Sequence, residues 1–218
     1  MGISERKERE KKRRRNAIID AAERVFFSKG VENTTMDEVA EQAELSKGTL
    51  YLYFKNKEEL FHGIVARGLG ILLKMFHAVV KKEEKGIDKV KALGRAYTEF
   101  YKTEPDYYGA MLHQETYEYD PETVERDSNI ALCEGLGEEI FGMMREMVET
   151  GIKDGTIRKD LDPARLPIIL WGHSAGVLHL VKAKEKIFRE KFALSPEEII
   201  EYSFQLIGHY LENKPGKE

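Results

Sequence analysis

Residues 34–57 read TTMDEVAEQAELSKGTLYLYFKNK, and this stretch sets the fold expected for the N-terminal part of the chain. Thr35 and Glu38 have the spacing of a capping box, in which the hydroxyl accepts from the Glu38 amide and the carboxylate binds back to the Thr35 backbone. Ser46 is a natural N-cap for a second, very short helix. The stretch therefore predicts two short helices joined by a tight turn, the arrangement that lets a second helix enter the major groove of DNA.

Apolar residues recur at helical spacing on both sides of this stretch. A first helix is predicted to carry the face that begins at Ala17 and to end at Gly30, a suitable C-cap. No alternating segment competes as a strand. We therefore expect an all-α protein, with a basic arm and a three-helix helix-turn-helix domain over residues 1–57 and a helical domain over residues 58–218. Later helices are predicted near residues 57–81, 90–101, 136–151, 166–181 and 200–211.

The residue types on the two short helices suit contact with DNA. Hydroxyls at the helix starts, Thr35 and Ser46, lie beside unpaired backbone N–H groups, which makes each start a phosphate site. Lys47 and Thr49 fall in the first turn of the second helix, where side chains reach base edges, and Gly48 lets the backbone approach the groove. The hydroxyls of Tyr51 and Tyr53 and the ammonium of Lys57 can bind phosphates. The candidate DNA-binding residues are Thr35, Ser46, Lys47, Gly48, Thr49, Tyr51, Tyr53 and Lys57.

This region resembles the tetracycline-repressor (TetR/AcrR) family of bacterial one-component regulators. The resemblance spans roughly residues 16–61 and is carried by Ala21-Ala22, Phe26, Gly30, Thr34 to Ala40, Ser46 to Tyr51 and Tyr53 to Leu60. It implies DNA contact through the same candidate residues, with Ser46 capping the recognition helix. It also implies a C-terminal bundle that binds a small molecule, a homodimer formed by the last two helices, and a repressor that holds a palindromic operator until its effector binds.

Glu44 departs from the family pattern, in which the turn usually has glycine. If this residue must adopt a left-handed backbone, its side chain costs about 1 kcal/mol there. The departure bears on local stability more than on function.

The charge of the chain is unevenly distributed. The whole chain has 35 basic and 39 acidic residues, a net charge of −4, yet residues 1–15 contain eight basic and three acidic ones. Each of these acids has a base four residues later, which supports a helix. Two interpretations stay open: the segment extends the first helix toward an anionic partner, or it is a solvated, frayed tail.

The central region, from Tyr97 to Met147, is rich in aromatic side chains and methionine, Tyr117 among them. Such residues suit a largely apolar pocket with a few polar anchors, although each one taken singly fits a protein core better than a pocket. Collectively they favour a hydrophobic or aromatic effector. The candidate ligand-binding residues are Tyr97, Phe100, Tyr101, Tyr108, Met111, His113, Met144 and Trp171.

Two stripes near the C-terminus could pair with a second copy of the chain. Small residues near Trp171 permit close approach of helices, and an apolar stripe follows on the last helix. Either stripe could instead complete the core of the monomer. The candidate dimer residues are Gly172, Gly176, Phe204, Ile207 and Leu211.

Other function classes find no support in the sequence. It has no phosphate loop, no nucleophile elbow and no paired carboxylates in a recognisable setting, so we expect neither an enzyme nor a cofactor. His113 with Glu115, and His173 with His179, lack metal-ligand spacing, and the single Cys133 fits a small buried hydrophobe.

Location and partners follow from the same composition. The uncharged segment from Leu166 to Val181 is shorter than the ~20 residues of a spanning helix, and we expect a buried helix there. With no signal sequence, the protein is expected to be cytoplasmic and off the membrane. The rival to a regulator is a helical ligand-binding or partner-binding protein with a vestigial helix-turn-helix.

Overall fold

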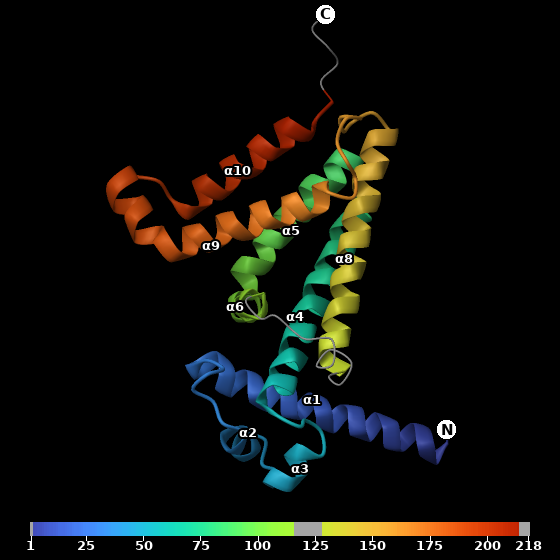
Figure 1. Cartoon of the computed structure of the whole chain (residues 1–218), viewed down its shortest axis with the longest axis vertical. Coiled ribbons are helices and arrows are strands. Elements are labelled where there is room, and N and C mark those ends of the chain that lie inside the picture. The colour runs from blue at the N-terminus through green and yellow to red at the C-terminus, as the bar shows by residue number, and fades with distance from the viewer. Residues whose placement is uncertain (1, 116–127, 214–218) are drawn as a thin grey trace, which may run out of the picture. The chain divides into compact units, whose positions relative to one another are not determined.

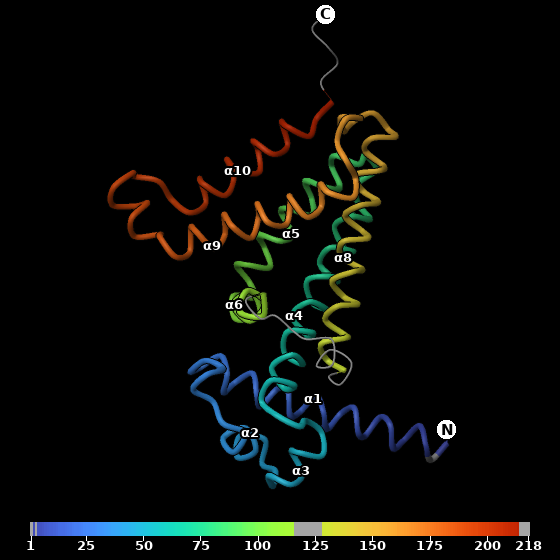
Figure 2. The backbone as a smooth tube through the Cα atoms, viewed as in Figure 1, coloured from blue at the N-terminus to red at the C-terminus, as the bar shows by residue number. Residues whose placement is uncertain are grey.

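The computed structural model describes residues 2–115 and 128–213, and the described chain is all-α, as the sequence predicts. Figures 1 and 2 show the helices in chain order. Within the described ranges the only β-type pairing is a single antiparallel bridge between Ile157 and Glu212. The helices are α1 (Ile3–Lys29), α2 (Met36–Gln42), α3 (Lys47–Tyr51), α4 (Lys57–Val80), α5 (Gly86–Thr103), α6 (Pro105–Gln114), α8 (Ser128–Lys153), α9 (Leu166–Phe192) and α10 (Pro196–Leu211).

The described residues form two compact units. The first comprises the chain up to Gly70 and the described residues between Asp106 and Leu136, and the second comprises Ile71–Pro105 and the described residues from Gly137 onward. Both α4 and α8 contribute to each unit. The domain boundary predicted after Lys57 stays a prediction.

The core of the first unit is built around α1. Ile18, Ala22 and Phe26 of α1 pack with Val39 of α2 and Leu50 of α3 in one apolar cluster. The same cluster includes the start of α4 and also Cys133, which is buried. Residues of α2 and α3 are buried in this cluster with α1 and α4, and this burial stabilises the two short helices. Helices of five to seven residues have little stability of their own.

The caps predicted from the sequence are present. The Thr35 hydroxyl accepts from the Glu38 amide at 3.3 Å, and Oε2 of Glu38 accepts from the Thr35 amide at 2.9 Å. The Ser46 hydroxyl accepts from the Thr49 amide at 3.2 Å. Glu44 has φ of 55°, so the backbone at this turn is left-handed and the condition for the strain at this residue is met. Gly30 has φ of 82° and ends α1, and its backbone N–H donates a hydrogen bond to the Phe26 carbonyl.

The second unit contains a core cluster shared by α5, α8, α9 and α10, with Ile87, Val148, Leu170 and Leu211 among its members. Helices α9 and α10 pack side by side and α10 also packs on α5 (Figure 2). α10 begins with a capping box in which Ser195 accepts from the Glu198 amide at 3.2 Å.

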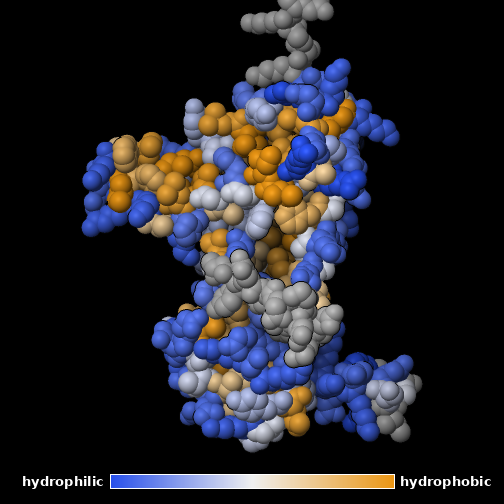
Figure 3. Space-filling model, viewed as in Figure 1, coloured by the Kyte–Doolittle hydropathy of each residue, from blue (hydrophilic) through white to orange (hydrophobic). Residues whose placement is uncertain are grey.

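The burial expected for the segment from Leu166 to Val181 is only half correct. Leu170, Leu178 and Val181 are buried, but Ile168 is 58% exposed and Ile169 60% exposed. The helix therefore has an apolar outer face as well as an inner one. Figure 3 shows apolar residues gathered over α9 and α10. By length and composition alone, α4 and α9 would each suffice to cross a membrane, a property that core helices of soluble proteins share.

Candidate DNA-binding site

Helices α2 and α3 present their N-termini as exposed ends capped by hydroxyl side chains. Thr35 and Ser46 are both exposed and both hold the cap of their own helix. The Thr35 hydroxyl also donates to Glu38 Oε2 at 2.9 Å, so its proton is already engaged within the chain. Backbone N–H groups of the first turns remain directed outward, the geometry in which helix ends bind phosphate.

Glu38 secures the start of α2 through charge as well as hydrogen bonding. Its carboxylate binds the Lys29 ammonium at the end of α1 and accepts from the Thr35 amide and hydroxyl. These bonds, that to Lys29 first, lower the pKa of Glu38 to about 2. The carboxylate is therefore ionised at neutral pH and ties α1 to the start of α2.

The first turn of α3 carries the side chains that suit base contact. Lys47 is exposed and its ammonium pairs with Asp37 in the first turn of α2. Gly48 has open space around it, since a Cβ added there would meet nothing within 4 Å. The Thr49 hydroxyl lies 2.9 Å from the Ser46 hydroxyl. The surface of this turn is thus polar, with Lys47 exposed and open space at Gly48.

The two tyrosines predicted to bind DNA differ in exposure. Tyr51 is 49% exposed at the end of α3, whereas Tyr53 is half-buried and packs against the core of the first unit. Lys57, at the start of α4, donates to the Glu32 carbonyl at 3.4 Å. Tyr51 is consequently the better placed of the two phenols for an external contact, and Tyr53 and Lys57 support the loop between α3 and α4.

The side chain of Asn129 links the N-terminus of α4 to α1 within the first unit. The amide nitrogen of Asn129 in α8 donates to the Glu59 carbonyl at 2.7 Å, and its oxygen accepts from Arg15 of α1. The Arg15 guanidinium also lies 4.9 Å from the centre of the buried Phe54 ring. These contacts tie α1 to Phe54 in the α3–α4 loop and to the start of α4.

Two features beside this site could not be predicted from the sequence, namely the counter-ion of Lys47 and the exposure of Leu52. Asp37 was not recognised as the counter-ion of Lys47, although its place in the first turn of a helix is a usual one for an acid. Leu52, directly after α3, is 82% exposed, which a run of aliphatic and aromatic residues did not indicate. Both lie beside predicted DNA-binding residues.

The candidate ligand-binding residues are divided between the two units. Tyr108, Met111 and His113 belong to the first unit and the other five to the second. Tyr97, Phe100 and Tyr108 are buried, as either a pocket or a core requires. Trp171 makes an edge-to-face contact with Phe141, with ring centres 5.7 Å apart. Tyr117, in the same aromatic group, lies outside the described residues.

His173 is a pocket candidate that the sequence did not single out. Its Nε2 atom is buried and, within residues 2–115 and 128–213, has no hydrogen-bond partner. Buried polar nitrogens are nearly always bonded, so this atom is suited to bind a group from outside the chain. Among the same residues no three His, Cys, Asp or Glu side chains are grouped to hold a metal ion.

The candidate dimer residues split into an exposed and an inward-facing set. Gly172 and Gly176 are exposed on α9. On α10, Leu211 is 1% exposed within the core, Ile207 packs on the same cluster, and a Cβ added at Gly94 would lie 2.8 Å from the Phe204 ring. For these three residues the structure thus favours the alternative, a role in the chain's own core, because α10 rests this stripe on α5.

Comparison with known proteins identifies the group to which this architecture belongs. The model of the tetR family of bacterial regulatory proteins matches residues 18–64, which contain the C-terminal part of α1, all of α2 and α3, and the start of α4. The uncharacterised HTH-type transcriptional regulator YhgD of Bacillus subtilis (strain 168) is 32% identical over 150 residues, 69% of this chain and 74% of YhgD.

The chain belongs to the tetR family of transcriptional regulators. The fatty acid metabolism regulator protein of Bacillus subtilis (strain 168) is 28% identical over 148 residues, 66% of this chain and 71% of that protein. A solved structure of FadR from Bacillus subtilis in complex with stearoyl-CoA has a TM-score of 0.70 at 17% identity, and the match covers 90% of this chain and 98% of FadR. The tetR-family fold thus extends over both units.

Proposed function

We propose that this regulator is a repressor that binds a palindromic operator as a homodimer and leaves it when a small hydrophobic effector binds. The observation that carries the proposal is the first turn of α3, where Lys47 and Gly48 are exposed, Thr49 is half-buried and the space around Gly48 is open, on a helix capped by Ser46. A short recognition helix with this surface fits the major groove. A bacterial protein that binds operator DNA acts where the DNA is, so this function implies a cytoplasmic protein.

The residues of the site divide by role. Lys47 and Thr49 read base edges from the major groove, and Gly48 allows the close approach. The caps of α2 and α3, at Thr35 and Ser46, hold phosphates with their first-turn amides, and the Tyr51 hydroxyl adds a third phosphate contact. Tyr53 and Lys57 position the α3–α4 loop and contribute at the edge of the interface.

Dimerisation rests on the outer faces of α9 and α10. Trp171 is 38% exposed on α9, beside the exposed Gly172 and Gly176, and α10 exposes a row of three large side chains four residues apart. Large apolar side chains gathered on one surface indicate an interface. A two-fold axis between such faces brings two α3 helices to adjacent major grooves, about 34–36 Å apart. The α10 row is Tyr202, Leu206 and Tyr210.

The effector is assigned to the aromatic region of the second unit. Tyr97, Phe100 and Tyr101 of α5, with Met144 of α8, supply apolar side chains, and the Nε2 of His173, which has no hydrogen-bond partner among the described residues, supplies one polar anchor. The stearoyl-CoA in the FadR neighbour supports an acyl chain as the apolar part of the ligand. Effector binding lowers the affinity for DNA only by the ratio of the effector's affinities for the DNA-incompetent and DNA-binding states.

The experiment that tests the proposal selects duplexes from a random library with the purified protein and then measures affinity for the selected sequence. Tyr51→Ala combined with Lys47→Ala is expected to lower that affinity at least tenfold, whereas Lys74→Ala, an exposed site on α4, leaves it unchanged. An unchanged affinity of the double variant would overturn the regulator mechanism in favour of a vestigial helix-turn-helix. Fluorescence of the single Trp171 during titration with stearoyl-CoA, alongside DNA release, tests the effector class.

A further inference from the structure

Helix α1 is longer than its packing requires. The apolar residues that α1 contributes to the core begin at Ile18, yet the helix begins at Ile3. The side chains from Ser4 to Arg14 are all exposed. About three helical turns therefore extend beyond the core with their side chains exposed, so packing does not explain them.

The extension also carries charge of the opposite sign to the rest of the chain. Eight of the first fifteen residues are basic and three are acidic, while the complete chain has a net charge of −4. A continuous basic helix in an acidic protein indicates an anionic partner. The structure favours the first of the two interpretations of this segment, because the helix is continuous from Ile3 to Lys29.

One flank of the extension lies beside the helix-turn-helix. Arg13 and Arg14, with Glu10 between them on the same side, line a shallow pocket together with Ala43 and Leu45 of the turn between α2 and α3. That turn leads directly into Ser46 and α3. The two arginines are thus adjacent to the surface that faces the operator in the proposed function.

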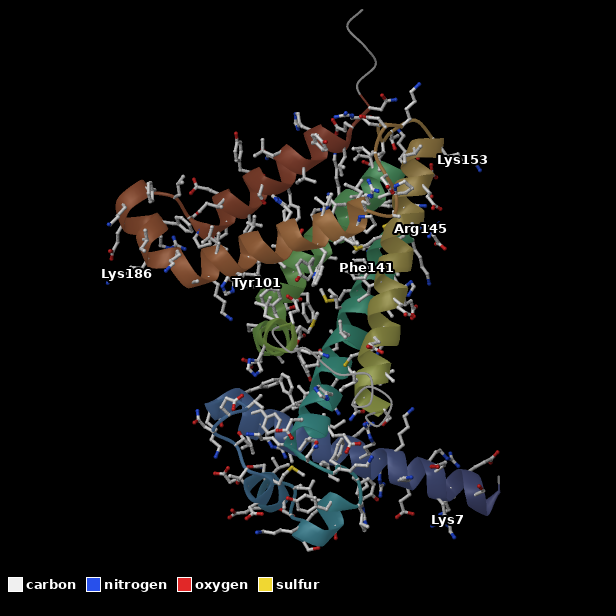
Figure 4. All side chains as sticks on the ribbon, in the orientation of Figure 1. Lys7, Tyr101, Phe141, Arg145, Lys153 and Lys186 are labelled. Carbon is white, nitrogen blue, oxygen red and sulfur yellow. The ribbon has the colours of Figure 1, made fainter. Side chains whose placement is uncertain are left out.

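The same flank continues toward the N-terminus. Arg6 and Lys7 precede Arg13 and Arg14 by seven residues, which is close to two helical turns and returns to the same side. Figure 4 shows the Lys7 side chain leaving α1 on the side on which α3 lies. Arg6, Lys7, Arg13 and Arg14 form what we call the basic flank. Arg15 is not part of it, because its guanidinium is bound to Asn129 and Phe54 inside the unit.

We propose that the basic flank of α1 binds the phosphate backbone of the DNA duplex next to the segment that α3 reads, which extends the protein–DNA interface beyond the helix-turn-helix. The inference rests on the proposed function. From Arg6 to Arg14 the helix rises about 12 Å, a length over which duplex DNA carries about seven charges. Guanidinium groups bind such phosphates bidentately, and helix geometry holds all four cations on one side.

Phosphate contacts have a signature that base contacts lack. Each one lowers the slope of log affinity against log salt concentration by about 0.9, whatever the DNA sequence. The experiment measures this slope for the full chain on two fluorescent duplexes of equal length, the selected operator and a scrambled sequence. Replacing all four flank residues with Gln, a good helix former, is expected to flatten the slope by up to about 3.6 on both duplexes.

A matched pair of variants locates the contact. Arg6→Gln with Arg14→Gln removes two charges from the basic flank, and Arg9→Gln with Lys12→Gln removes two from other sides of the same helix. We expect the first pair to flatten the slope by about 1.8 and the second by less than half as much. Equal effects of the two pairs, or no effect of the quadruple variant, would overturn the proposal.

The outcome is separable from that of the proposed function. The Tyr51→Ala, Lys47→Ala variant tests sequence reading, and the quadruple variant tests the sequence-independent term on the scrambled duplex. A flank that binds scrambled DNA while the α3 variant loses nothing would sustain this inference and refute the proposed role of α3. Wild-type binding to phosphatidylserine vesicles that exceeds binding to either duplex, and that the quadruple variant loses, would reassign the flank to membrane lipid and overturn it.

Discussion

The phenolic hydroxyl of Tyr107 in α6 donates a hydrogen bond of 2.7 Å to Oε1 of Glu23 in α1, across 84 positions of sequence. Arg67 of α4 binds both oxygens of Glu23 at 2.9 Å and Asp20 at 2.6 Å, so three helices of the first unit meet at one carboxylate. Burial raises the pKa of Glu23 above its ordinary value, and burial together with the Glu23 bond raises the pKa of Tyr107 to about 12. The group therefore keeps α6 attached to the helix that supports the DNA-binding surface.

The first prediction concerns the Tyr107–Glu23 bond. Tyr107→Phe leaves Glu23 with Arg67 but removes one donor from a half-buried carboxylate, and we expect the free energy of unfolding to fall by about 1–2 kcal/mol. Urea denaturation measures the change. Tyr51→Phe, at an exposed site at the end of α3, is the control and should change it by less than about 0.5 kcal/mol. Equal effects at both sites would mean that the bond contributes nothing.

The second prediction follows from the lowered pKa of Glu38. A carboxylate whose folded pKa is about 2, against 4.5 ordinarily, stabilises the fold above pH 4.5, and this contribution is lost as the pH falls toward 2. Glu38→Gln should therefore be less stable than the wild type at neutral pH, and the difference should shrink steadily below pH 4.5. Thermal unfolding across a pH series measures it, with Glu41→Gln on the same helix as the control. A difference that stays constant with pH would contradict the assignment.

The third prediction tests the closest helix approach in the second unit. A Cβ at Gly86 of α5 would lie 2.1 Å from the backbone nitrogen of Gly151 in α8, so Gly86→Ala must separate the two helices. We expect a loss of about 3 kcal/mol or more in the free energy of unfolding. Gly142→Ala, in open space on α8, is the matched control and should be neutral or stabilising by up to about 1 kcal/mol.

Local features of the site were predictable from the sequence because they depend on residues three or four positions apart. The capping box of Thr35 and Glu38, the cap at Ser46 and the left-handed turn at Glu44 all depend on the backbone within one helical turn. Tertiary pairings were not predictable in this way. The partners of Glu23 come from α4 and α6, and no spacing pattern in α1 points to either.

Helix α10 shows why the sequence does not indicate which of two apolar faces is buried. Two apolar rows lie along it, one with Phe204 and Leu211 and another with Leu206 and Tyr210, so periodicity alone gives no direction. The packing of Phe204 on Gly94 of α5 decides between them, since only a residue without a side chain accepts the ring there. A glycine within the middle of α5 is the sequence signal that could have indicated the contact.

The fourth prediction concerns the ion pair between Lys47 and Asp37. In the proposed interface the Asp37 carboxylate lies close to phosphates, which repel it, and it competes with the base edges for the Lys47 ammonium. Asp37→Asn should therefore raise affinity for the selected duplex about two- to fivefold at low salt, because an exposed ion pair is worth up to about 1 kcal/mol. Fluorescence anisotropy measures it, and Asp106→Asn, exposed at the start of α6, should have no such effect. Weaker binding of the Asp37 variant would show that the carboxylate is needed to position Lys47.

The fifth prediction separates the two faces of α10 in the proposed dimer. Leu206 is 54% exposed and Leu211 is 1% exposed, so Leu206→Glu places a charge on the outer face without entering the core. A charge buried in an apolar interface is costly, and we expect this variant to sediment as a monomer that retains its helical content and its thermal transition.

Two comparisons make that result specific. Leu132→Glu, at an equally exposed leucine of α8, should leave the oligomeric state unchanged. Leu211→Ala should lower the free energy of unfolding by about 2–5 kcal/mol, the cost of truncating a buried leucine. A dimeric Leu206→Glu variant would remove α10 from the interface and direct attention to the exposed Ile168 and Ile169 of α9. Because each operator half-site holds one α3 helix, the monomeric variant should also lose affinity for the palindrome far more than for a single half-site.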